Sequence, residues 1–178
     1  MSSYFLMNSK TILGVSIATV FALSMMVLPI SASDGSFLDI IKAQASGNGK
    51  NAHIKTAATI PTDGNSGLFG YGIPAANGVL GITSHGGVLD SDAQSGLSDP
   101  IFHSHLVTAA TDAGICPGGV KVTSITFGEV GDVSVHNKMI AVKNIDTNAV
   151  GALNPSGAFS FTIGFGTDAT SVCLTPHP

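Results

Sequence analysis

Short apolar runs separated by glycine, proline and aspartate recur along the chain from residue 53 onward. In the run 158–165, four large apolar residues alternate with small or polar ones: Phe159, Phe161, Ile163 and Phe165. Residues two apart on a strand share a face. The pattern therefore predicts a strand with four large side chains turned to the core. Further strands are expected at the other runs, which are 54–60, 79–83, 101–110, 120–127, 133–136, 139–145 and 170–175.

About seven short strands at turn-punctuated spacing predict an all-β fold, either an antiparallel β-sandwich or a small barrel. We expect this β-domain to occupy residues 53–178. Residues 33–52 are small and polar, and Gly, Ser and Asn dominate their end, which predicts a polar linker or a short helix. The Gly- and Pro-rich stretch 68–78 is typical of a loop.

Residues 1–32 predict an N-terminal hydrophobic targeting helix. Lys10 precedes an uncharged apolar run over residues 11–30, and small residues follow at 31–32. This order is typical of a cleaved signal peptide. A run of about 20 uncharged residues is also long enough to span a bilayer, so a retained anchor is the alternative. In both cases the charges flanking the run place the following domain outside the cytoplasm, secreted or at the cell surface.

The charged residues narrow the expected function. The chain has seven Lys, no Arg, ten Asp and one Glu, Glu129, and a formal net charge of −4. Without Arg the chain has no planar guanidinium group that could bind phosphate or carboxylate through two parallel hydrogen bonds. An acidic domain with few aromatic residues is also a poor nucleic-acid binder. We therefore expect no nucleic-acid partner, and a membrane contact only through an uncleaved N-terminal segment. The motifs G-x-S-x-G, H-E-x-x-H and C-x-x-C are missing, so an enzyme is not expected.

Two cysteines, Cys116 and Cys173, are the only ones in the sequence. In an exported chain an even pair is most simply one disulfide. It would tie the last predicted strand to the turn at 115–119.

His103-Ser104-His105 suggests a transition-metal site. Residues two apart on a strand point to the same face about 6.5 Å apart, so both imidazoles can reach one ion. His85, which precedes Gly86-Gly87, is the candidate third ligand. Imidazole ligation favours copper or zinc as the cofactor. The alternative is that the two histidines are partly exposed on a sheet and incidental to a structural or adhesive surface protein.

A second metal hypothesis concerns Asp90, Asp92 and Gln94. Oxygen ligands at alternate positions are typical of calcium loops, although the Gly and the bidentate Glu that an EF-hand requires are missing. The alternative is a solvated loop with Asx turns.

Two local resemblances add expectations. The stretch 87–107, with one later Cys and a final Cys173, resembles a group of uncharacterised exported proteins of ammonia-oxidising archaea. That resemblance implies that the protein is located at the cell surface, and it favours copper as the metal of the histidine site. The segment Cys173-Leu-Thr-Pro-His177 is similar to the Cys…Pro-His segment of cupredoxins, with His136 as the upstream imidazole. It implies a third possible function, a cupredoxin-like electron carrier.

Overall fold

The computed structural model describes residues 35–63, 66–84, 102–126 and 128–178. The predicted leader, His85 and the predicted calcium loop at Asp90, Asp92 and Gln94 lie outside the described residues. Within those ranges the protein is mostly β, and the expected all-β class is confirmed. The elements in chain order are β1 (Ile40–Ser46), β2 (Asn51–Thr56), β3 (Phe69–Ala75), β4 (Gly78–Ser84), β5 (Phe102–Ala110), β6 (Val120–Ile125), β7 (Asp132–His136), β8 (Met139–Lys143), the helical turns α2 (Thr147–Val150) and η1 (Pro155–Gly157), β9 (Phe159–Phe165) and β10 (Val172–Pro176).

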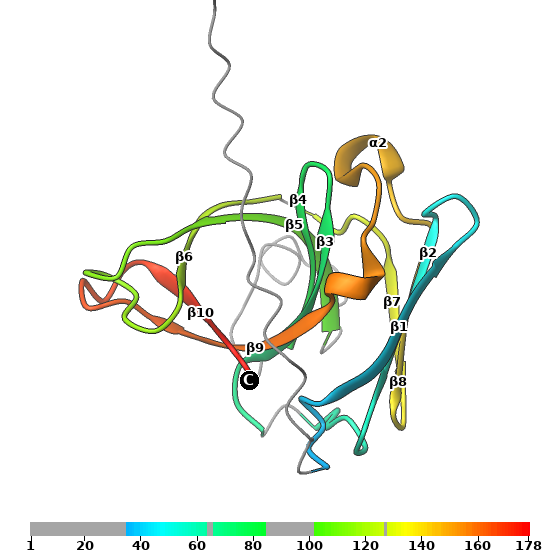
Figure 1. The fold of residues 1–178 in the computed structure, drawn as a ribbon, viewed down its shortest axis with the longest axis horizontal. Coiled ribbons are helices and arrows are strands. Elements are labelled where there is room, and N and C mark those ends of the chain that lie inside the picture. Colours follow the sequence, from blue (N-terminus) through cyan, green and yellow to red (C-terminus); the bar gives the residue numbers. More distant parts are fainter. Residues whose placement is uncertain (1–34, 64–65, 85–101, 127) are drawn as a thin grey trace, which may run out of the picture.

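Six of the strands close into an antiparallel barrel in the order β10-β6-β5-β4-β3-β9, and four form a separate sheet in the order β1-β2-β8-β7. Figure 1 shows the four-stranded sheet standing beside the barrel, on the side of β3, β4 and β5. Of the two expected architectures, the small barrel is the one that forms. The additional sheet raises the strand count above the predicted seven.

The main core lies between the barrel and the four-stranded sheet. Outward-facing residues of β3, β4 and β5 pack there against inward-facing residues of β2 and β8, and nearly all are fully buried. They include Tyr71, Ile73, Leu80, Ile82 and Phe102 from the barrel, and Ala52, Ile54, Ile140 and Val142 from the sheet. This core holds the outer surface of β5 against the sheet and leaves its other face to the barrel interior.

A second, smaller core fills the barrel itself, around Val107, Phe161 and Leu174. Its wall contains glycines where the two phenyl rings of β9 come close. A Cβ on Gly70 would lie 2.6 Å from Phe161 Cζ, and one on Gly72 would lie 2.6 Å from Phe159 Cζ. The missing side chains on β3 therefore make the space into which β9 places its rings.

This fit gives a test of the barrel interior. Gly70→Ala is expected to lower the free energy of unfolding by about 1–3 kcal/mol, because the added methyl group overpacks a closed wall. The matched control is Gly164→Ala on β9, where a Cβ meets nothing within 4 Å. Chemical denaturation of both variants measures the difference. Equal stability of the two would contradict the placement of Phe161 against Gly70.

Two stretches expected to lack strands form strands instead. Residues 40–46, predicted as linker or short helix, are β1, which pairs with β2 through a turn at 47–50. The turn residues Gly47, Asn48 and Gly49 have positive φ, as a tight hairpin requires. The stretch 68–78, predicted as a loop, contains β3, whose Gly70 and Gly72 serve the barrel interior. The β-domain thus begins before residue 53.

The predicted strand 54–60 is also displaced, since β2 ends at Thr56. Hydrogen bonds to the β7–β8 turn explain why β2 ends there. The Thr56 amide donates to the Lys138 carbonyl, and the Ile60 amide donates to the Asn137 carbonyl. Residues 57–60 therefore cross the end of the sheet rather than extend it.

The alternating strand β9 is buried along only part of its length. Phe161 is 1% exposed, Phe159 and Ile163 are half-buried, and Phe165 is 69% exposed. The expectation that all four face the core is wrong for Phe165. The register explains why: β9 pairs with β3 only over 159–162, and its last residues pair with β10 alone. The end of the β9–β10 hairpin therefore projects beyond the barrel.

The segment that precedes β1 covers Ser160 on the polar face of β9 and Tyr71 on β3. The Ser160 hydroxyl donates to the Leu38 carbonyl at 2.5 Å, and the Tyr71 hydroxyl donates to the Phe37 carbonyl at 2.8 Å. Burial raises the pKa of Tyr71 above its usual range. Near the other end of the chain, His177 Nε2 lies 3.3 Å from Asp39 Oδ1. These contacts join the first described residues to the last strands.

Candidate functional site: a buried histidine pair in the barrel

His103 and His105 lie on β5, which has β4 on one side and β6 on the other. The strand is therefore an interior strand of the barrel wall. Their exposed fractions are 0% and 4%, so the alternative that they are partly exposed is wrong. The physical reason is closure: once β9 and β10 complete the barrel, the inner face of β5 no longer meets solvent.

Cross-strand register places each histidine in a row that runs around the barrel wall. His103 is paired with Thr83, which is paired with Gly70 and then Phe161. His105 is paired with Gly81, Gly72 and Phe159 in the same way. Each row thus joins a histidine to a phenylalanine through small residues. The interior combines a polar pair on β5 with an aromatic pair on β9.

The two imidazole rings are close to parallel, with centroids 6.2 Å apart and planes 18° apart. Each ring has an oxygen atom close to its Nδ1 atom. His103 Nδ1 lies 3.2 Å from Glu129 Oε1, and His105 Nδ1 lies 3.2 Å from the Thr126 carbonyl oxygen. Both oxygen atoms belong to the segment that follows β6.

That segment is held along β5 by its backbone. The Val130 amide donates to the Ser104 carbonyl at 3.0 Å, and the Leu106 amide donates to Thr126 Oγ1 at 3.1 Å. The Ser104 hydroxyl, on the opposite face of β5, donates to the Gly131 carbonyl. Glu129 and Thr126 are therefore positioned by the same hydrogen bonds that extend the barrel wall.

The Thr126 carbonyl selects one tautomer of the neutral His105 imidazole. A carbonyl oxygen can only accept, so His105 carries its proton on Nδ1 and its lone pair on Nε2. The Glu129 carboxylate lies within ion-pair distance of His103 Nδ1. An Nδ1–H held by a carboxylate or a backbone carbonyl is the support that metal-binding histidines usually have, and it raises the basicity of the other nitrogen.

Glu129 is the part of the site that sequence reasoning missed. It is the only Glu in the chain, and its side chain is 28% exposed while its partner ring is fully buried. A separation of 26 residues and the irregular turn after β6 hide the contact from any local pattern. Its being the sole Glu in an Asp-rich sequence was the one available indication.

The structure does not gather the other candidate ligands around the pair. Within residues 35–63, 66–84, 102–126 and 128–178, no group of three His, Cys, Asp or Glu side chains is arranged to hold a metal ion. His53 and His136 belong to β2 and β7 of the separate sheet. His177 contacts Asp39. His85 follows Ser84, the last residue of β4, and remains a prediction outside the described ranges.

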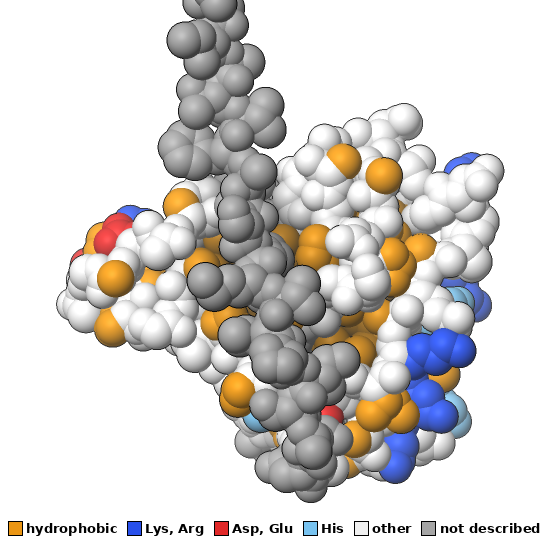
Figure 2. Space-filling view, viewed as in Figure 1, with side chains coloured by type: hydrophobic (Ala, Val, Ile, Leu, Met, Phe, Trp, Pro, Cys, Tyr) orange, Lys and Arg blue, Asp and Glu red, His pale blue; other side chains and the backbone are white. Residues whose placement is uncertain are grey.

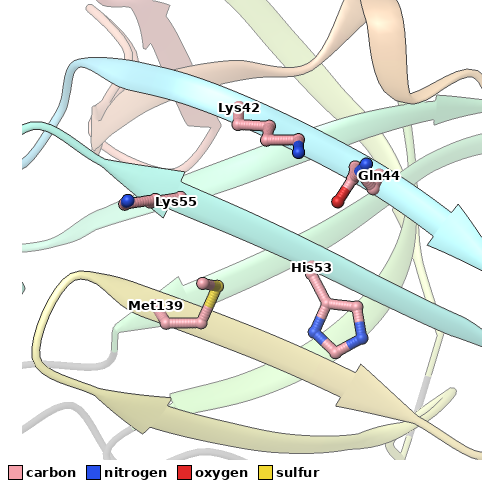
Figure 3. A pocket seen from close by; sticks show the side chains of 5 residues that line it. All are labelled: Lys42, Gln44, His53, Lys55 and Met139. Carbon is pink, nitrogen blue, oxygen red and sulfur yellow. The ribbon is translucent and has the colours of Figure 1, made fainter.

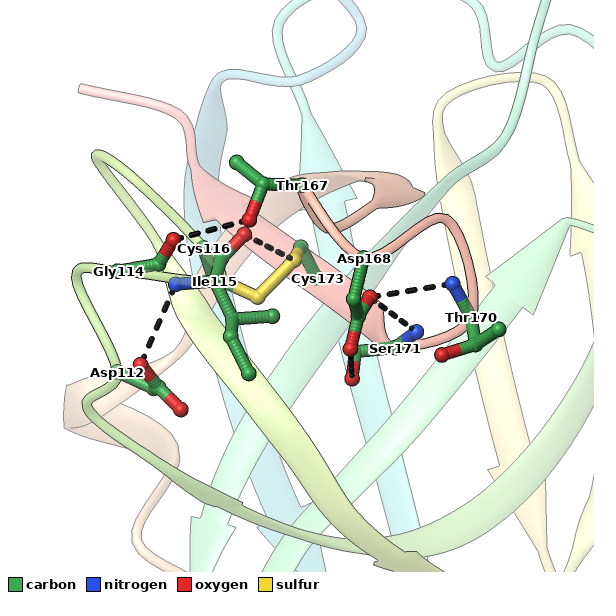
Figure 4. Close-up of a disulfide and its surroundings, with 9 residues drawn as sticks. All are labelled: Asp112, Gly114, Ile115, Cys116, Thr167, Asp168, Thr170, Ser171 and Cys173. Carbon is green, nitrogen blue, oxygen red and sulfur yellow. Dashed lines mark hydrogen bonds between the residues drawn. A yellow bond between two sulfur atoms is a disulfide. The ribbon is translucent and has the colours of Figure 1, made fainter.

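The predicted disulfide is confirmed. Cys116 and Cys173 are bonded, with Cα atoms 5.6 Å apart, and the bond joins β10 to the turn before β6 (Figure 4). Hydrogen bonds reinforce the same corner: the Thr167 hydroxyl and amide donate to the Gly114 and Ile115 carbonyls, each at 2.9 Å. A copper site that uses Cys173 as a thiolate would require this bond to be reduced.

An exposed carboxylate orders the neighbouring turn. Asp168 accepts hydrogen bonds from the Ser171 hydroxyl at 2.6 Å, the Ser171 amide at 2.8 Å and the Thr170 amide at 3.1 Å (Figure 4). These bonds, with the Ser171 hydroxyl the largest cause, hold the pKa of Asp168 well below its usual range. The turn that leads into Cys173 therefore keeps a charged acceptor at any ordinary pH.

Comparison of the chain with models of protein families, with curated proteins and with solved structures finds no match. In the part of the chain that the structure describes, no helix has the length and apolar character needed to cross a membrane. The disulfide suggests an oxidising environment, as is found outside the cytoplasm. The class defined so far is a disulfide-closed, all-β protein with a buried imidazole pair.

Proposed function

We propose that this protein is an extracytoplasmic domain, secreted or at the cell surface, that binds a copper or zinc ion through His103 and His105. One observation carries the proposal. Two adjacent imidazoles are buried in the barrel, and each has an oxygen atom 3.2 Å from Nδ1, a carboxylate oxygen beside His103 and a carbonyl oxygen that accepts from His105; the second contact makes Nε2 the basic nitrogen of His105. Imidazole nitrogen suits copper and zinc.

Binding would require a small rearrangement of the rings. Zinc–nitrogen bonds are about 2.0–2.1 Å long, so two ligating nitrogens lie closer together than parallel rings with centroids 6.2 Å apart. Rotation about the side-chain torsions would bring the Nε2 atoms together. The contacts at Nδ1 with Glu129 and Thr126 would act as pivots.

A zinc site usually has at least three protein ligands. The proposed third ligand is His85, because it follows β4 directly and β4 is the strand paired with β5. The glycines at 86–87 would give that segment backbone freedom. The export part of the proposal is supported by the disulfide and by the sequence of residues 1–32.

The metal site predicts a selective loss on mutation. His103→Ala and His105→Ala are each expected to weaken copper or zinc binding at least about tenfold, or about 1.4 kcal/mol, measured by competition with a chelator of known affinity. His85→Ala should have a comparable effect. The matched control is His136→Ala, an exposed histidine of β7, which should bind like the native protein.

The pH dependence of binding is a second readout of the same site. Protons compete with the metal ion for the ring nitrogens, so metal affinity should fall as the pH is lowered. Because a buried histidine variant can be less stable, the fold of each variant is checked by circular dichroism without metal, and His105→Gln serves as the milder change.

An equal loss of metal affinity in all histidine variants would indicate diffuse surface binding. Affinity no tighter than micromolar would leave the structural or adhesive function. Intense blue absorption with copper would instead support the electron carrier.

A further inference from the structure

Positive charge is concentrated on the four-stranded sheet. Five of the six lysines in the described ranges belong to its strands and hairpin turns, namely Lys42, Lys50, Lys55, Lys138 and Lys143. Figure 2 shows lysines gathered on this side of the molecule, with histidine among them. The whole chain has a formal net charge of −4. The positive charge of the lysines on this sheet is therefore opposite in sign to the net charge of the whole protein.

Acidic residues in and beside these strands make contacts of their own: Asp39 with His177, and Asp132, which is also the register partner of Lys143. Asp132 accepts a hydrogen bond from the Asn144 amide at 2.6 Å, and Asp146 caps α2 by accepting from two backbone amides. Lys138 is engaged as well, since its Nζ donates to the Ala57 carbonyl at 2.6 Å. The cations on the open surface of the sheet are thus mainly those of β1 and β2.

Two of those cations are placed directly opposite each other. Lys42 on β1 and Lys55 on β2 are register partners, and like charges in directly opposed positions destabilise a sheet. Lys55 is in turn paired with Met139 on β8. Gln44 is paired with His53 in the next row. A bound anion would offset the cost in stability of this like-charge pair, which lies at the β1 edge of the sheet.

These five residues, which we call the lysine hollow, line a shallow depression of about 340 Å³. Figure 3 shows the Lys42 side chain directed along β1 toward Gln44, with His53 across from them on β2 and Lys55 extending the opposite way. The Lys42 ammonium and the Gln44 amide thus lie near each other over β1, while the His53 ring is turned toward β8. Met139, which is 39% exposed, supplies an apolar wall.

We propose that the lysine hollow is an anion site for a phosphate group, supplied by free phosphate or by a phospholipid headgroup. A phosphate ester carries about −1.5 to −2 charges at pH 7, which matches the charge of the two register-paired lysines, whose side chains would turn toward the bound anion. Lysine binds phosphate as a point charge and needs no planar fork, so the absence of Arg does not count against it. The site is separate from the histidine pair, and either proposal can fail without the other.

The first arm of the test uses inorganic phosphate at constant ionic strength. Titration followed by backbone amide NMR should give saturable shifts confined to β1, β2 and β8. Lys42→Gln and Lys55→Gln are each expected to weaken binding at least about fivefold, and the double variant to abolish it. The matched control is Lys121→Gln on β6, which should bind as the native protein does.

A second readout separates a binding site from a merely structural pair. Without phosphate and at low salt, Lys55→Gln should raise the thermal midpoint, because it removes the repulsion between two lysines in register-paired positions. Added phosphate should raise the midpoint of the native protein but not that of the double variant. A lower midpoint for Lys55→Gln without phosphate would overturn the proposal.

The second arm identifies the source of the phosphate. Vesicles of phosphatidylglycerol and of phosphatidylcholine are compared by co-sedimentation at matched salt. If the protein binds the anionic vesicles and free phosphate displaces it from them, the ligand is the lipid headgroup. If the protein binds inorganic phosphate but not the vesicles, the ligand is the small ion. Either result supports the site. Saturable binding in neither arm, binding that Lys121→Gln weakens equally, or only salt-reversible self-association of the protein would overturn it.

Discussion

Phe161→Ala is expected to lower the free energy of unfolding by about 3–5 kcal/mol, as is typical of a buried phenylalanine. The Phe161 side chain is 1% exposed and packs in the barrel with Val107 and Leu174. Its ring fills the space left by Gly70. Since small domains are stable by only about 5–15 kcal/mol, the loss should be severe in chemical denaturation.

The matched control for this variant lies on the same strand. Phe165 is 69% exposed at the end of the β9–β10 hairpin, so Phe165→Ala should change stability by no more than about 0.5 kcal/mol. The same residue type in the same alternating pattern is thus expected to differ by several kcal/mol. Similar losses in the two variants would contradict the register by which β9 extends past β3.

Removing the disulfide is expected to cost about 4 kcal/mol. The Cys116–Cys173 bond closes a loop with a sequence separation of 57, and the loop-entropy estimate for that length is about 4 kcal/mol. The bond also attaches β10, one of the two strands that complete the barrel, to the turn before β6. Denaturation of the Cys116→Ala/Cys173→Ala double variant, compared with the native protein, measures the effect.

Reduction provides the control for that experiment. A reducing agent should destabilise the native protein by a similar amount and leave the double variant unchanged. If reductant lowered the stability of both equally, its effect would not arise from this bond. A native protein in which both thiols react freely with an alkylating agent before reduction would contradict the disulfide itself.

Local patterns predicted the strands whose side chains alternate, and they failed where a distant partner decides the structure. The β7–β8 hairpin and β9 were located from their own residues. The strand β3 was missed because Gly70, Gly72 and Pro74 are typical of a loop, and only the rings of β9 explain the two glycines. The strand β1 was missed because Lys42, Ala43 and Gln44 carry no strand preference. The Gly47-Asn48-Gly49 turn was the indication that a hairpin was present.

The candidate histidine site also has one feature that local sequence predicts and others that depend on distant segments. That His103 and His105 share one face follows from their spacing on a strand. Their complete burial and the contact with Glu129 depend on elements 20 or more residues away. The lysine hollow was not predicted, because its residues come from β1, β2 and β8 and meet only through cross-strand register.

The sequence by itself determined the all-β class, the partner of each cysteine and the common face of the histidine pair. Each of these depends on residue type or on spacing within one segment. The tertiary structure decided barrel closure, the separate sheet and the depth at which each side chain lies. Those features depend on pairing between distant segments, such as β3 with β9 and β2 with β8. Such pairing is selected by the packing of the whole chain, which no local pattern of residues encodes.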